Sequence, residues 1–202
     1  VAASATPVWT LPPGYDSIEI ELAARCDGAV AHTRMGVILN GETLNTNYLW
    51  QYHYGSSSAG VQQVNARYAG YIAGTTTTGY NLYTTHKMEL RDYSSSAIHK
   101  HLLNQYSPHA SGSYVAVGMA SVVWKNIAPV TTIQFDVVEG GYNFLAGSRF
   151  KLWGVKSREV VVDGRASDPT PPSPPAQVAS FAIAGVVGVG AQPFRIYNVW
   201  GS

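Results

Sequence analysis

Histidines are the residues of this chain whose spacing comes nearest to a metal site. His99 and His101 lie two positions apart, so on a strand both side chains point the same way and could share an ion. His86 or His109 would supply a third ligand. Two histidines are too few for a tetrahedral site, and no Asp or Glu sits at a matching spacing. We interpret these histidines as polar surface residues and predict neither a metal nor a cofactor.

The acidic residues are scattered along the chain, and solvation on polar strand faces accounts for Glu19, Glu21 and Glu89. A glycosidase needs two carboxyls roughly 5 to 10 Å apart in a groove, which the sequence neither indicates nor excludes. The sequence contains no nucleophile elbow, phosphate loop, dinucleotide fingerprint or His-Glu-x-x-His helix. These observations favour a protein that binds or builds and is not an enzyme.

Aromatic residues form the most concentrated feature of the sequence. Tyr48, Trp50, Tyr52 and Tyr54 share one face of a predicted strand. Such a row can stack on sugar rings or fill a core, and we favour the core. Tyrosines nearer to predicted loops are the candidates for ligand contact, because rigid amphipathic side chains give contact area at low entropic cost. These candidates are Tyr80, Tyr83, Tyr93 and Tyr106.

The elements that must position these residues are strands. Apolar and charged residues alternate over 18–22 and 86–91, the period of two that is typical of a strand with one wet face. Residues 35–39 repeat the pattern before an Asn40-Gly41 turn. Residues 114–124 are apolar on both faces, which predicts a strand in the middle of a packed sheet. About eight or nine such strands predict an all-β, two-sheet antiparallel β-sandwich of jelly-roll type.

Proline marks the predicted domain boundaries. Residues 1–14 end in Pro-Pro-Gly and are expected to form an extended arm, residues 15–160 the sandwich, and residues 161–175 a Pro-rich linker. Residues 176–202 are an apolar tail too short to bury its own surface. The tail should dock on its own sandwich or on another subunit, and the reach of the linker favours the other subunit. Its candidate assembly contacts are Phe181, Ile183, Phe194, Tyr197 and Trp200.

Composition limits the partners. Only 12% of the residues are charged and the formal net charge is +1, so the chain has no strong positive potential that would attract nucleic acid. No apolar run is long enough to cross a bilayer, and the N-terminal residues do not have the pattern of a signal peptide. We expect a soluble protein with no membrane insertion. The single Cys26 cannot form an internal disulfide and is expected to be a structural thiol.

Three segments resemble jelly-roll virion proteins of tailed bacteriophages. Residues 147–155, Gly-Ser followed by an aromatic and apolar strand ending in Trp-Gly-Val, resemble the closing strand of that group. Residues 15–22 resemble the opening strand after a Pro-rich lead, and residues 37–48 resemble a strand, Asn-Gly turn and Asn-Tyr pair. The likeness covers residues 10–156 and implies a virion component with no catalytic residues.

The leading functional hypothesis is a virion structural protein that acts by contact at the particle surface, as a tail-fibre or other host-attachment module. Its expected partners are other virion subunits, a host-surface glycan or protein, and further copies of itself, with a trimer favoured. One alternative places the fold on the capsid as a decoration or head-fibre protein. The other is a carbohydrate-binding module of a secreted protein, which should be a monomer.

Overall fold

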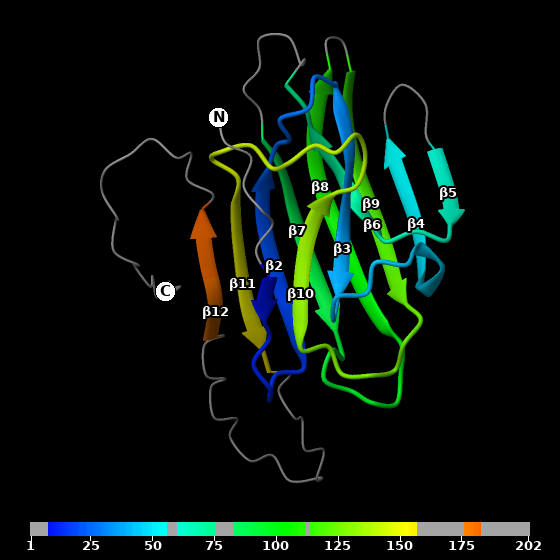
Figure 1. Ribbon diagram of the computed structural model, residues 1–202, viewed down its shortest axis with the longest axis vertical. Helices are drawn as coiled ribbons and strands as arrows, with labels where there is room; N and C mark the ends of the chain where they lie inside the picture. The colour runs from blue at the N-terminus through cyan, green and yellow to red at the C-terminus, as the bar shows by residue number, and fades with distance from the viewer. Residues whose placement is uncertain (1–7, 56–59, 76–82, 112–113, 157–175, 183–202) are drawn as a thin grey trace, which may run out of the picture.

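Antiparallel strands make up nearly all of the regular structure (Figure 1). The computed structural model describes residues 8–55, 60–75, 83–111, 114–156 and 176–182. Within these residues there is no α-helix, so the predicted all-β class is confirmed. The elements are β1 (Val8–Thr10), β2 (Ser17–Ala24), β3 (His32–Leu39), the 3₁₀ turn η1 (Asn45–Asn47), β4 (Tyr48–Gly55), β5 (Gly60–Val64), β6 (Tyr68–Ala73), β7 (Thr84–Arg91), β8 (Lys100–Ser111), β9 (Tyr114–Trp124), β10 (Thr132–Val137), β11 (Arg149–Val155) and β12 (Ala176–Ala182).

The strands form two antiparallel sheets of unequal size. The smaller sheet has the order β1-β10-β3-β6, and the larger has the order β12-β11-β2-β7-β8-β9-β4-β5. Figure 1 shows β10 and β3 lying across the face of the larger sheet. Twelve strands are present in the described residues, more than the eight or nine expected, and two of them, β1 and β12, lie in the predicted arm and tail.

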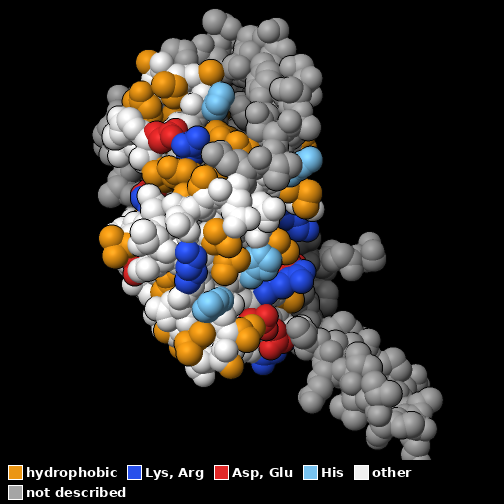
Figure 2. All heavy atoms as spheres, turned by 90° about the vertical axis from the view of Figure 1, so that its right-hand side faces the viewer, with side chains coloured by type: hydrophobic (Ala, Val, Ile, Leu, Met, Phe, Trp, Pro, Cys, Tyr) orange, Lys and Arg blue, Asp and Glu red, His pale blue; other side chains and the backbone are white. Residues whose placement is uncertain are grey.

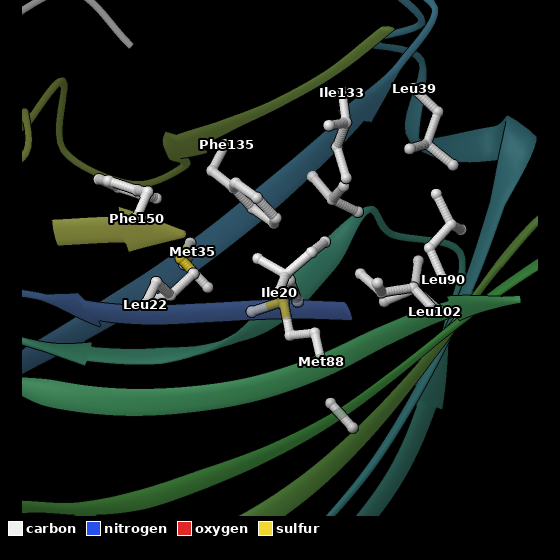
Figure 3. Close-up of a cluster of buried hydrophobic side chains, with 14 of the residues drawn as sticks. Ile20, Leu22, Met35, Leu39, Met88, Leu90, Leu102, Ile133, Phe135 and Phe150 are labelled. Atoms are coloured by element: carbon white, nitrogen blue, oxygen red, sulfur yellow. The ribbon is translucent and has the colours of Figure 1, made fainter. Parts of the chain in front are cut away.

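The core lies between the two sheets. Along β7, the buried residues Thr84, His86, Met88 and Leu90 alternate with outward-facing ones, as the sequence period predicts. Figure 3 shows side chains from both sheets pointing toward one another. The Phe150 ring of the larger sheet lies 5.4 Å from that of Trp9 and 6.2 Å from that of Phe135, both in the smaller sheet. Each fully buried side chain of this size contributes about 1.5 to 3 kcal/mol of hydrophobic stabilisation.

The fold begins within residues 1–14, which were predicted to form an extended arm outside it. Val8–Thr10 pairs with β10, and Trp9 and Leu11 are buried in the core. The turn at Asn40-Gly41 is present, with φ values of 52° and 74°. It does not close a hairpin, because β3 and β4 belong to different sheets.

The prediction that β9 lies buried in the middle of a packed sheet is wrong. We expected it to be apolar and buried on both faces, but Val117 is 58% exposed and Met119 is 56% exposed. Ala120 and Val122, on the opposite face, are buried. The larger sheet has its core on one side only, so the outward residues of β9 face solvent.

The described part of the predicted tail is β12, which pairs with β11 of its own chain. Docking on its own sheet was one of the two arrangements expected. The Pro-rich linker lies outside the described residues, as do residues 183–202. Among the residues that the structure describes, no helix has the length and apolar character needed to span a membrane.

Candidate functional site

An open groove runs over the outer face of the larger sheet. Its volume is about 640 Å³, and its walls come from β2, β7, β8, β9 and β11. A second hollow of about 380 Å³ adjoins it and shares Lys87, Gln105 and Met119. The outward-facing residues of the groove alternate along each strand with residues buried in the core, so the same period that builds the core also builds this surface. They are Glu21, Ala23, Thr85, Lys87, Gln105, Ser107, Val117, Met119, Arg149 and Lys151.

Strand register brings five of these residues into one row. Lys151 lies opposite Glu21, and Glu21 lies opposite Lys87. Lys87 lies opposite Gln105, which lies opposite Met119. Neighbouring strands are about 4.8 Å apart, so the row is roughly 20 Å long. A row of this length can contact several units of an extended polymer.

The groove combines hydrogen-bonding groups with exposed apolar ones. Lys87, Arg149 and Lys151 supply donors, and no carboxylate of another described residue lies within 4 Å of their charged groups. Val117 and Met119 supply apolar surface at the β9 side. This arrangement can donate hydrogen bonds to hydroxyl or carboxylate oxygens while its apolar part packs against C–H groups.

Two of the tyrosines predicted to contact ligand are buried, which corrects that prediction. Tyr93 is 1% exposed, and its hydroxyl donates to the carbonyl of Pro12. Tyr106 is 2% exposed, and its ring stacks 5.5 Å from that of His86. Tyr106 also covers Gly118 on the core face, where a Cβ would lie 2.0 Å from the ring. Both tyrosines fill space inside the protein and neither is available to a ligand.

The other two tyrosines have different outcomes. Tyr83 is half-buried, and its hydroxyl donates to the carbonyl of Ala146 at 2.7 Å. That bond ties the start of β7 to the turn before β11. Tyr80 lies outside the described residues. The groove therefore contains none of the described candidates except Tyr106, whose ring lies beneath its floor.

The aromatic row on β4 is largely core, as we favoured. Tyr48 and Trp50 are buried, and Trp50 stacks on the half-buried Tyr52 with ring centroids 4.2 Å apart. The Tyr48 hydroxyl accepts the amide of Leu39 at 3.0 Å and donates to the carbonyl of Glu42 at 2.9 Å. Burial raises the pKa of Tyr48 to about 12.

A cluster of side chains around Arg34 lies at the β6 edge of the smaller sheet. The Arg34 guanidinium lies 4.8 Å from the Tyr68 ring centroid and pairs with Glu139 at 2.7 Å. Its Nε also donates to the Tyr71 hydroxyl at 3.5 Å. Figure 2, which faces the β5 edge, shows charged side chains as small separate groups among hydrophobic and neutral ones. Since the Arg34 groups bond to one another, this cluster is a weaker ligand site than the groove.

The histidines do not converge. His99 precedes β8 and is exposed, whereas His101 lies on the outer face of the larger sheet with Nε2 2.5 Å from Ser121 Oγ. His86 points into the core, and its Nδ1 lies 2.9 Å from Asn104 Nδ2. The described residues contain no group of three or more His, Cys, Asp and Glu side chains that could hold a metal ion.

Two buried polar side chains serve the fold. Cys26 is fully buried, and its burial raises the pKa of the thiol. Lys100 is also fully buried, and its ammonium donates to the carbonyls of Ser95, Ile98 and Ile127. Burial lowers the pKa of Lys100. Sequence reasoning missed Lys100, because no local pattern distinguishes it from an exposed lysine.

The predicted assembly contacts are mostly outside the described residues. The backbone of Phe181 lies opposite Phe150 in the β11–β12 register. Ile183, Phe194, Tyr197 and Trp200 follow the last described residue. Sequence reasoning also missed the groove, although the outward positions of 18–22 and 86–91 had been recognised as a wet face.

Comparisons with known proteins found no relative. No protein-family model, no curated protein and no solved structure matches this chain.

Proposed function

We propose that this chain is a structural protein of a bacteriophage particle, built as a β-sandwich of jelly-roll type and acting by contact at the particle surface. In this role it belongs to a tail fibre or another host-attachment module. Its partners are neighbouring virion subunits, further copies of itself and a glycan or protein on the host surface.

The strand order supports the jelly-roll part of the proposal. A jelly roll has eight strands in two sheets, and its chain passes repeatedly from one sheet to the other. Here β1, β3, β6 and β10 belong to the smaller sheet, whereas β2, β7 and β11 belong to the larger. The strand β12 adds an eighth strand beside β11. The hairpins β4–β5 and β8–β9 are then additions to one edge.

The observation that carries the contact role is the row from Lys151 to Met119 across the outer sheet face. A surface with donors, one carboxylate and exposed apolar groups, with little net charge in the chain as a whole, suits a neutral or weakly acidic bacterial polysaccharide. Fold alone does not establish function, so the groove and not the jelly roll is the part to test.

The test measures binding of the purified protein to an array of bacterial surface polysaccharides. The variant Lys87→Ala/Lys151→Ala removes two donors from the row and should weaken binding at least tenfold. The matched control is Lys125→Ala, an exposed lysine that bonds to Thr46 and Asn65 away from the groove. Equal binding by the row variant and the wild type would remove the groove from the proposal.

A carbohydrate-binding module remains a second candidate function, because the same groove would serve it. Oligomeric state separates the two. Light scattering at micromolar concentration should give a trimer or larger assembly for a virion protein, whereas an isolated module should give the mass of one chain, 21.7 kDa.

A further inference from the structure

Two neighbouring strands of the larger sheet are joined by a connection far longer than they need. β11 and β12 are adjacent and antiparallel, and Gly154 lies opposite Ala176. Antiparallel neighbours are normally joined by loops of about two to five residues. Here the connection is residues 156–175, which could extend to roughly 70 Å.

The sequence of the connection predicts an extended run just before β12. Five of the seven residues in 169–175 are proline. A run of this kind prefers an extended conformation of about 3.1 Å per residue, so 169–175 alone would span roughly 22 Å. The strand ends that it joins are separated by only about 5 Å, the distance between paired residues. A connection that reaches well beyond this distance can also bring β12 to a neighbouring copy of the chain.

The strand β12 is also replaceable without disturbing the rest of the sheet. It lies at the end of the strand order, and β11 is its one neighbour in the sheet among the strands that the structure describes. It pairs with β11 from Arg149 to Gly154, and the register shifts once, between Leu152 and Trp153. An identical β11 edge exists on every copy of the chain. The same contacts can therefore be made within one chain or between two.

We infer that β12 is exchanged between copies of this chain, so that each copy completes the β11 edge of a neighbour. Exchange keeps every β11–β12 contact, and the connection is long enough to carry β12 to the β11 edge of a neighbouring copy. Exchange of an identical element in this way is a low-cost route to a symmetric oligomer. The inference deepens the assembly role in the proposed function by naming the element that joins subunits, and polysaccharide binding in the groove does not depend on it.

A pair of disulfide variants distinguishes exchange from pairing within one chain. Lys151 lies opposite Ser180 on one side and opposite Glu21 on the other. Lys151→Cys/Ser180→Cys therefore reports on β12, and Glu21→Cys/Lys151→Cys is the matched control within the sheet. Paired antiparallel residues are separated by about 4.5 to 5.5 Å, which suits a disulfide. The native thiol of Cys26 is fully buried and does not compete.

Both full-length variants are oxidised at micromolar concentration and analysed by denaturing gel without reductant and by intact mass. The control should cross-link within single chains. The β12 variant should give covalent dimers, trimers or larger species that collapse to one chain on reduction. A β12 variant that forms its disulfide within single chains overturns the inference, and so does one that forms none while the control oxidises. Polysaccharide binding is measured on the wild-type chain, because Lys151 and Glu21 belong to the row in the groove. Covalent oligomers of the β12 variant together with no binding by the wild-type chain would reject attachment and keep exchange, and the reverse result would reject exchange alone.

Discussion

Arg67 donates two hydrogen bonds to the carboxylate of Asp136, at 2.5 and 2.7 Å, from Nη1 and Nη2. The pair joins the segment between β5 and β6 to β10, and its side chains are only 11% and 25% exposed. Gly36 lies beneath it, where a Cβ would come within 2.4 Å of Nη1. A glycine in β3 is therefore needed for this ion pair.

Replacing Asp136 with Leu should lower the free energy of unfolding by about 2 to 3 kcal/mol, because Arg67 would lose its carboxylate in a mostly buried site. The double variant Arg67→Met/Asp136→Leu should recover much of that loss, since no uncompensated charge remains. Chemical denaturation of the single and double variants measures both values. A double variant less stable than Asp136→Leu would contradict a coupled pair.

Met88 and Met119 offer a matched test of which sheet face is core. Met88 is 1% exposed, whereas Met119 is 56% exposed. Met88→Ala should destabilise the protein by about 2 to 5 kcal/mol through a cavity and lost burial. Met119→Ala should change stability by less than about 0.5 kcal/mol and should weaken polysaccharide binding. Thermal melts and the polysaccharide array check the two parts, and equal destabilisation by both variants would contradict the assignment.

Lys100 and Lys125 are a second matched pair. Lys100→Ala leaves the carbonyls of Ser95, Ile98 and Ile127 without this charged donor and should cost about 2 to 3 kcal/mol of stability. Lys125 is exposed, and Lys125→Ala should cost less than about 0.5 kcal/mol. Denaturant titration at neutral pH gives both numbers. Similar losses for the two lysines would show that the carbonyl site does not hold its loops together.

Stability should fall in alkaline solution in a way that depends on Tyr48. Its folded pKa is about 12, above the ordinary value of 10.0, so the folded state keeps the phenolic proton over a range where the unfolded state has lost it. The contribution is complete below pH 10 and is lost as the pH rises through 12. The loss by pH 12 should amount to about 2 kcal/mol. Tyr48→Phe should lack this part of the decline, and parallel pH profiles for variant and wild type would contradict the argument.

Local periodicity predicted the strands that have one wet and one dry face. β2, β3 and β7 fall where the alternation placed them, because the core imposes a period of two on their sequence. The same reasoning failed at β9. The outward side chains of Val117 and Met119 are apolar, so composition could not show which face meets solvent.

The pairing of strands could not be predicted from the sequence, because register and sheet order depend on contacts between residues far apart in the chain. Nothing local shows that β2 lies between β11 and β7, yet this order forms the groove. The tyrosine predictions failed for a related reason. Tyr93 and Tyr106 were assigned to a binding surface from their nearness to loops, but nearness to a loop does not determine exposure.

The site of Lys100 bears on the conditions that this protein can tolerate. Its ammonium is held by backbone carbonyls and not by carboxylates, so acid cannot protonate its partners. Mobile ions screen exposed charges over about 8 to 10 Å but act weakly on buried contacts. The end of the molecule that contains Ser95, Ile98 and Ile127 should therefore keep its shape from dilute to concentrated salt and through mild acidification. In the proposed virion role, in which the chain passes from one medium to another, this constancy would preserve its contacts.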